Sequence, residues 1–300
     1  MTAWIVLRRA TAVAALLLLS PTTAQAASDT DPMLCTYCKE WSVPQQPFNI
    51  YGNTWYVGTR ELSAVLITSP QGHILLDGTL SQAAPQIAAN ITRLGFRLTD
   101  VKLILNSHAH FDHASGIAAL QRMSGARVAA SPSGAQALRN GTVGADDPLF
   151  ETVTPRRYPK VAQVEEVSDG QVLQIGPLSV MAHATPGHTP GGTTWSWLSC
   201  QDQRCLNIVY ADSLSPISED GFRFRGGPGH ADVSASFRAS IAKVAALPCD
   251  IIISVHPGLT DVMDKHAGQT PRHSPFIDGN GCRAYAAEAD EALTKRLAHE

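Results

Sequence analysis

The chain has 300 residues, and its 44% of hydrophobic residues supply enough apolar material for a large folded core. The formal net charge is −3, only 16% of the residues are charged and no basic run occurs, which argues against a nucleic-acid partner. After the first 26 residues, no apolar stretch is long enough to cross a membrane.

Residues 1–26 have the pattern of a secretory signal peptide. A pair of arginines precedes an apolar stretch that ends at Leu19, and this stretch is shorter than the roughly 20 residues of a membrane-spanning helix. The AQA sequence that ends at Ala26 is typical of a cleavage site. We therefore expect export to the periplasm, by the general secretory route or by the twin-arginine route, and a single domain over residues 27–300.

Strand and helix patterns alternate along the mature chain. In chain order we expect strands at 48–58, 62–69 and 73–78, a helix at 81–95, a strand at 101–107, a helix at 116–125, a strand at 126–131 and a helix at 134–141. Further on we expect strands at 171–176, 178–185, 193–198 and 206–212, a helix at 234–247, a strand at 249–255 and a last helix at 284–300. This series predicts two sheets packed face to face with helices outside, and functional residues where strands end.

Six cysteines in an exported chain predict disulfide bonds. Cys200 and Cys205 flank a short polar loop between two predicted strands, so we expect a disulfide across that hairpin. Cys35 and Cys38 leave three alternatives, which are a local disulfide, a redox pair or half of a zinc site. Because the chain has no second pair with this spacing, we favour the disulfide.

The segment NSHAHFDH, directly after an apolar strand, contains four residues that can bind metal: His108, His110, Asp112 and His113. In an extended backbone the first two project to one side, and a turn at Phe111 lets the other two face a second point nearby. Imidazoles and a carboxylate are ligands that zinc prefers. A catalytic zinc needs three protein ligands and an open position, so two ions need six ligands and two must come from elsewhere.

Two further histidines have suitable surroundings. His188 lies in the flexible sequence ATPGHTPGG, and His256 follows the buried strand CDIIISV. His183 lies inside a predicted strand, and we interpret it as a packed core residue. The remaining histidines are expected at the surface: His73, His230, His266, His273 and His299. The sequence therefore predicts a site for two Zn²⁺ ions.

The motifs YGNTWYVGT, ILLDG, SHAHFDHASG, ATPGHTPGGT, VYADSLSPIS and HPG occur in this order along the chain. With them the chain resembles the metallo-β-lactamase superfamily, and in particular the class B, subclass 3 metallo-β-lactamases. The resemblance implies a four-layer αββα sandwich of two mixed β-sheets with helices on both outer faces. It also implies the ligand sets: His108, His110 and His188 for the first zinc, and Asp112, His113 and His256 for the second.

Two positions distinguish the subclasses. Ser213 occupies the position at which the largest subclass has a zinc-ligating cysteine. A second subclass has asparagine at the first position of the cluster, where this chain has His108. Both features resemble subclass 3.

The other cysteines fit the resemblance to different degrees. A disulfide between Cys249 and Cys282, which would tie a buried strand to the start of the last helix, is common in the subclass. Relatives with an N-terminal disulfide pair one cysteine there with another just after the YVGT motif, where this chain has Arg60. The pairing of Cys35 with Cys38 is therefore a departure from the family pattern.

The resemblance implies hydrolysis of the β-lactam amide of penicillins, cephalosporins and carbapenems, and hence antibiotic resistance. Two zinc ions about 3.5–4 Å apart share a hydroxide that attacks the carbonyl. Asp112 would serve mainly as a ligand and orient the hydroxide, and it is one candidate for the group that delivers a proton to the ring nitrogen, which the sequence does not identify. Ser213 and Ser215 match residues that contact the substrate carboxylate in relatives, although ordinary turn serines are an alternative. Trp55 and Tyr56 are candidates for a pocket wall, but aromatic residues at such positions more often serve plain packing.

Two rival functions remain at this point. A lactonase or thioester hydrolase of the same fold would bridge both metals with an aspartate, for which Asp212 is the candidate. A non-catalytic zinc-binding protein would close its coordination shells with protein ligands, whereas six ligands for two ions leave open positions. We expect a monomer with small-molecule substrates and no nucleic-acid or membrane partner.

Overall fold

The structure is a computed structural model that describes Met1 and residues 28–151, 156–270 and 272–300. The predicted signal peptide lies outside these residues apart from Met1, so cleavage near Ala26 and the domain limits stay predictions. Within the described part of the chain, no helix has the length and apolar character needed to span a bilayer.

The described strands form two mixed β-sheets, as the sequence predicts. The first has the order β1 (Phe48–Tyr51), β2 (Thr54–Tyr56), β3 (Val65–Ile67), β4 (His73–Leu76), β5 (Val101–Leu105), β6 (Arg127–Ala130) and β7 (Glu165–Glu166). The second has the order β12 (Ile251–Ser254), β11 (Arg204–Ala211), β10 (Thr193–Gln201), β9 (Leu178–Ala184) and β8 (Val172–Ile175). The first sheet is antiparallel from β1 to β4 and parallel from β4 to β7, and in the second only β11 and β12 are parallel.

The helices connect these strands. They are α1 (Cys38–Trp41), α2 (Ala84–Arg93), α3 (Phe111–Ala114), α4 (Ile117–Ser124), α5 (Pro132–Asn140), α6 (Ser234–Ala246), α7 (Val262–Ala267) and α8 (Gly281–Ala298), with short 3-10 turns at Ser81–Ala83, Leu98–Asp100 and Pro257–Thr260. Most were expected, but the short elements α1, α3, α7 and β7 were not. The single strand expected at 48–58 is wrong, because the chain turns at Gly52, whose φ of 50° favours glycine, and forms the β1–β2 hairpin.

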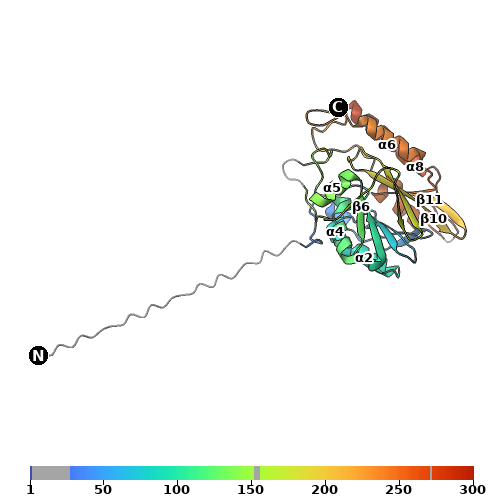
Figure 1. Ribbon diagram of the computed structural model, residues 1–300. Coiled ribbons are helices and arrows are strands. Elements are labelled where there is room, and N and C mark those ends of the chain that lie inside the picture. The colour runs from blue at the N-terminus through green and yellow to red at the C-terminus, as the bar shows by residue number, and fades with distance from the viewer. Residues whose placement is uncertain (2–27, 152–155, 271) are drawn as a thin grey trace.

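Three clusters of buried apolar side chains separate the four layers of the fold, which are two β-sheets and a layer of helices on each outer face. Alternate residues of the first sheet point to opposite faces, so Leu66 and Ile104 pack against α2, α4 and α5, whereas Val65 and Leu105 face the second sheet. Between the sheets they meet side chains such as Trp195. The other face of β11 and β12 packs under α6 and α8. Figure 1 shows α2, α4 and α5 on one side of the strands and α6 and α8 on the other. The predicted αββα sandwich is confirmed.

The cysteines are joined in three disulfides. They are Cys35–Cys38, Cys200–Cys205 and Cys249–Cys282. The second links residues directly opposite each other in the β10–β11 hairpin. The third ties the residues before β12 to the first turn of α8. Each pairing favoured from the sequence is therefore present.

Candidate metal centre

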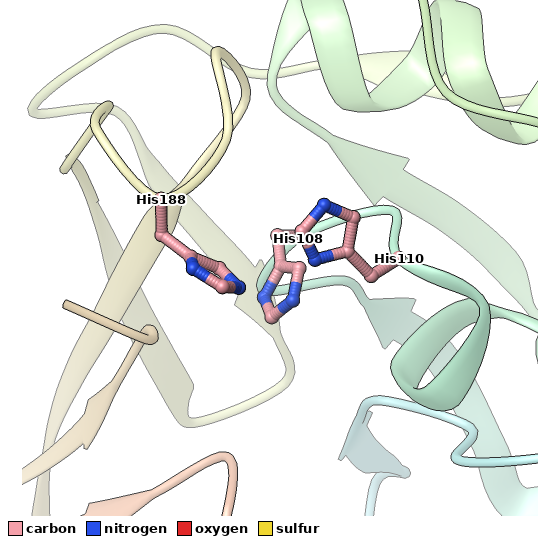
Figure 2. A group of neighbouring side chains, drawn as sticks. All are labelled: His108, His110 and His188. Carbon is pink, nitrogen blue, oxygen red and sulfur yellow. The ribbon is translucent and has the colours of Figure 1, made fainter. Parts of the chain in front are cut away.

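The predicted ligands come from loops that follow three strands. The segment that starts at Asn106 follows β5, His188 lies in the loop between β9 and β10, and His256 follows β12. Figure 2 shows the imidazole of His188 directed toward those of His108 and His110, which come from the other sheet. The two sheets therefore bring their loops together at one edge of the sandwich, and the ligands meet there.

The start of the histidine segment is fixed by Asp77, the buried aspartate of the ILLDG motif. Its carboxylate accepts hydrogen bonds from the Ser107 backbone N–H at 2.8 Å and from the Ser107 hydroxyl at 2.6 Å. It also accepts from the Asn106 amide at 3.0 Å and from the Tyr210 hydroxyl at 2.9 Å. The same Asn106 amide donates to the carbonyl of His108 at 2.7 Å. The chain therefore enters the site in one defined conformation.

The backbone then changes from extended to helical. His110 is extended and immediately precedes α3, while Asp112 and His113 lie in the single turn of that helix. The extended stretch and a turn at Phe111 were both predicted, but the helical form of that turn, α3, was not. The turn is held close to the ILLDG motif, because a Cβ at Gly116 would lie 2.1 Å from the carbonyl oxygen of Gly78. Only glycine fits at that approach.

His108, His110 and His188, here called the three-histidine group, each offer a ring nitrogen within 4.8 Å of the others. All three side chains are buried. The opposite nitrogen of each ring has a partner: Asp212 Oδ1 at 2.6 Å from His108 Nδ1, Asp147 Oδ1 at 2.9 Å from His110 Nε2, and the Ser215 carbonyl at 2.8 Å from His188 Nδ1. Such partners fix the ring and its tautomer, so the free nitrogens face one point.

A metal ion fits this group. His108 Nε2 is buried without a hydrogen-bond partner among the described residues. An unsatisfied buried polar atom costs about 1–3 kcal/mol, and metal coordination would satisfy it. The Oδ1 atom of Asp212 contacts Nδ1 of His108, so Asp212 lies on the opposite side of the imidazole ring from Nε2. This placement does not favour Asp212 as a bridging ligand.

Asp112, His113 and His256, here called the Asp-His-His group, converge even more closely. His113 Nε2 lies 3.2 Å from His256 Nε2, and Asp112 Oδ2 lies 3.1 and 3.3 Å from those two nitrogens. Ligands about 2.0–2.1 Å from a tetrahedral zinc are about 3.3 Å apart. The three separations therefore match three edges of such a tetrahedron, and a metal fits here too.

The protonation states of His108, His188 and Asp112 favour metal binding. Burial lowers the pKa of His188 to about 3, and burial together with the neighbouring His113 places the pKa of His108 well below its ordinary value. Both rings are therefore neutral, as metal coordination requires. Burial alone would raise the pKa of Asp112, but His113 and His256 hold it well below the ordinary range. The Asp112 carboxylate is consequently anionic. Burial alone would lower the pKa of His113, but the neighbouring Asp112 carboxylate raises it, so a metal ion would have to displace a proton there.

Both groups open into one cleft of about 370 Å³. The two serines singled out in the sequence, Ser213 and Ser215, line this cleft. Its aromatic wall comes from Trp41, whose ring centre lies 5.7 Å from that of His256, together with Tyr37 and neighbouring aromatic residues.

Trp55 and Tyr56 serve packing and do not form the cleft wall. Trp55 packs against Phe96, and Tyr56 is fully buried between the sheets. The expectations for two histidines need correction. His73 was expected in a surface turn, but it is the first residue of β4 and is buried, with its Nδ1 accepting from the Ser69 backbone N–H. His183 is half-buried on the outer face of β9, where it bonds Ser196 at 2.7 Å.

Two contributors to the site were missed. Asp147 lies in the loop after α5 with no motif around it, and its neighbour Asp146 gives no reason to choose between them. Trp41 lies far from the metal-ligand motifs in the chain, so nothing in its surroundings indicated a place in the cleft. Both positions depend on tertiary contacts that local sequence does not specify.

Comparisons with known proteins agree with this geometry. Residues 57–201 match the pattern of the Metallo-beta-lactamase superfamily. The solved Rm3 metallo-beta-lactamase is 48% identical, with a TM-score of 0.85 over 89% of this chain and 99% of that one. MEM-A1, a subclass B3 metallo-beta-lactamase isolated from a soil metagenome library, is 49% identical, with a TM-score of 0.83 over 86% and 98%.

A more distant similarity is to a hydroxyacylglutathione hydrolase of Maricaulis maris, which is 28% identical over 145 residues. That match covers 48% of this chain and 43% of the relative, so the chain spans less than half the length of this curated relative. The two solved structures, by contrast, are matched over almost their whole length. The chain therefore belongs to the metallo-β-lactamase superfamily, and within it to the subclass B3 metallo-β-lactamases, which are metal-dependent hydrolases.

Proposed function

We propose that this protein hydrolyses the β-lactam amide of penicillins, cephalosporins and carbapenems with two zinc ions. The observation that carries the proposal is the pair of three-ligand groups that open into one cleft. Three protein ligands per ion leave a coordination position for water or substrate, as in catalytic zinc sites. Zinc, when bound, supplies a coordinated water with a pKa near 7 and polarises the substrate carbonyl.

The residues of the chain would have separate tasks. The three-histidine group would supply neutral nitrogen ligands only, which would leave the charge of a bound ion available to polarise a substrate carbonyl. The Asp-His-His group includes the anionic Asp112, which lies at the cleft. We assign Asp112 the orientation of the attacking water and the transfer of a proton toward the ring nitrogen.

Ser213 and Ser215 are assigned to the substrate carboxylate. Both line the cleft near the metal ligands, and a serine hydroxyl donates one hydrogen bond to such an acceptor. The carbonyl of Ser215 accepts from His188, which fixes the backbone at this point. Because this hydrogen bond holds the backbone of Ser215, the hydroxyl of Ser215 starts from a fixed position in the cleft.

The alternative function is hydrolysis of a lactone or thioester with Asp212 as bridging ligand. The contact of Asp212 with the rear nitrogen of His108 favours the β-lactamase over this alternative. A role restricted to zinc binding is less favoured, because the open cleft at both groups leaves them accessible. With the predicted export signal, the enzyme would act as a monomer in the periplasm and confer antibiotic resistance.

The test uses the purified mature protein loaded with zinc. We expect hydrolysis of imipenem and nitrocefin, loss of activity with EDTA and recovery when zinc is added. A hydroxyacylglutathione thioester and a lactone are assayed in parallel. Faster turnover of either parallel substrate would favour the alternative, and β-lactam hydrolysis that persists in EDTA would contradict the zinc mechanism.

A further inference from the structure

The Cys35–Cys38 disulfide lies at the wall of the cleft that contains the metal ligands. Cys35 is partly exposed and lines the cleft, together with Thr36 and Tyr37. Cys38, by contrast, is 5% exposed and belongs to the core between the helices and the first sheet. Cys35 is therefore the residue of the pair that borders the cleft, and Cys38 is covered by the protein.

The chain on either side of the disulfide has anchors of its own. The Ser42 hydroxyl donates to the Cys38 carbonyl at 2.7 Å, and the Thr59 hydroxyl donates to the Trp41 carbonyl at 2.7 Å. On the other side, the Met33 backbone N–H donates to a side-chain oxygen of Gln82 at 3.0 Å. The polypeptide on either side of the Cys35–Cys38 pair is therefore also held by hydrogen bonds that do not involve the two sulfur atoms.

Thiol–disulfide exchange needs a thiolate to reach one sulfur while the other leaves. Because Cys38 is covered, an incoming thiolate reaches the sulfur of Cys35, and Cys38 is the leaving group. The motif has the C-x-x-C spacing that is typical of exchange-active pairs.

We propose that Cys35 is a thiol-exchange site at the entrance of the catalytic cleft. A small thiol of the glutathione class loses its proton and attacks Cys35 Sγ. The new S–S bond joins the small thiol to Cys35, the Cys35–Cys38 bond breaks, and the Cys38 sulfur takes the electron pair and then a proton. No other oxidant or reductant is consumed, because the disulfide itself is the electron acceptor.

The adduct would act on substrate binding. It occupies the wall next to Tyr37, whose side chain is 55% exposed, and so narrows a cleft of about 370 Å³. The metal ligands lie on other elements and keep their partners. We therefore expect KM to rise while the zinc content is unchanged, an effect on activity that rests on the proposed β-lactam hydrolysis.

The other two disulfides provide internal comparisons. Cys200 and Cys205 are both exposed, but they lie at the end of the β10–β11 hairpin and do not line this cleft. Cys282 is 2% exposed and packs in the core under α6 and α8. Exchange at the hairpin is therefore expected to leave KM unchanged.

Single variants separate the two sulfurs of the pair. Zinc-loaded Cys38→Ser, which keeps the accessible thiol, is incubated with oxidised glutathione, desalted and analysed by peptide mass spectrometry. We expect one glutathione at Cys35 and a KM for imipenem at least fivefold higher than in the unmodified variant. Cys35→Ser, which keeps only the covered thiol, should form no adduct under the same conditions.

The wild-type protein is incubated with reduced glutathione, and an excess of iodoacetamide is added afterwards to alkylate the Cys38 thiol together with the remaining glutathione. Chains that carry glutathione on Cys35 and the alkyl group on Cys38 are expected, and a Cys200→Ser/Cys205→Ser double variant should behave in the same way. Glutathione on Cys38, or an adduct on Cys35 that leaves KM unchanged in an active enzyme, would overturn the proposal. An adduct on Cys35 in a protein that hydrolyses no β-lactam would leave the exchange site intact and contradict the proposed function instead.

Discussion

In the three-histidine group every ring has a hydrogen-bond partner behind it, whereas the Asp-His-His group is supported unevenly. His108, His110 and His188 are held by an aspartate, an aspartate and a carbonyl, and all three are buried. In the other group, His113 Nδ1 is buried with no partner among the described residues. The side chain of His256 is 28% exposed.

The difference concerns preorganisation of the ligands. A ring held from behind loses little freedom when a metal binds, and loss of such a partner typically reduces metal affinity 10–100-fold. The Asp-His-His group compensates in part with the charge of Asp112, whose Oδ2 contacts both imidazoles of the group. We infer that the three-histidine group binds its metal more tightly and that the Asp-His-His group binds the more exchangeable ion.

The largest effect is expected for His108→Ala. This change removes a ligand from the well-supported group and leaves the buried Asp212 without its partner. We expect kcat/KM for imipenem to fall at least about 1,000-fold, equivalent to about 4 kcal/mol of transition-state stabilisation. Zinc content measured by atomic absorption should fall as well.

His183→Ala, on the outer face of β9, is the matched control and should keep wild-type activity. A His108→Ala protein with a tenth of wild-type activity would contradict the assignment.

A smaller effect is expected for Asp147→Asn, which weakens the support of one ring. The buried carboxylate of Asp147 lies 2.9 Å from His110 Nε2. We expect a 10–100-fold weaker affinity of the three-histidine group for zinc, measured by competition with a chromogenic chelator. Activity should recover in excess zinc, as a purely structural defect would not. The neighbouring Asp146→Asn, at an exposed position, should bind zinc normally. Equal affinities in the two variants would remove Asp147 from the site.

The sequence predicts the candidate ligands of both groups better than it predicts the residues that hydrogen-bond to those ligands. His108, His110, Asp112 and His113 are close in sequence, and their spacing after an apolar strand suffices to predict that their side chains gather in two neighbouring groups. The support of His110 comes from a loop that is 37 residues away in the chain. No local pattern encodes such a contact, because it depends on how that loop crosses the edge of the sandwich.

The fold shows the same contrast between elements that local sequence predicts and elements that depend on tertiary contacts. The strands β3 to β6 and the helices between them have strong apolar periodicity, and their order was predictable. The elements that sequence patterns missed are short, such as α1 and α3, and their few residues are ordered by tertiary contacts. His73 illustrates the same limit, because a histidine beside a Pro-Gln-Gly turn suggested the surface while the packing buries it.

A third change, His256→Ala, tests the order of the two zinc affinities directly. Titration of metal-free protein with zinc is expected to show two phases that differ about tenfold or more in affinity. His256→Ala should remove the weaker phase and leave the tighter one, because only the Asp-His-His group loses a ligand. The reverse result, with loss of the tighter phase, would invert the comparison between the two groups.

The smallest effect is expected for Ser215→Ala, which tests a residue that serves both the metal site and the substrate. Its backbone carbonyl accepts from His188 Nδ1, and alanine retains that carbonyl. The hydroxyl that we assign to the substrate carboxylate is lost, and a hydrogen bond to a charged group contributes about 1.5 kcal/mol or more. We therefore expect KM for imipenem to rise about tenfold while kcat and zinc content stay within about twofold of wild type. A fall in kcat with loss of zinc would instead show that the hydroxyl, and not only the carbonyl, supports the three-histidine group.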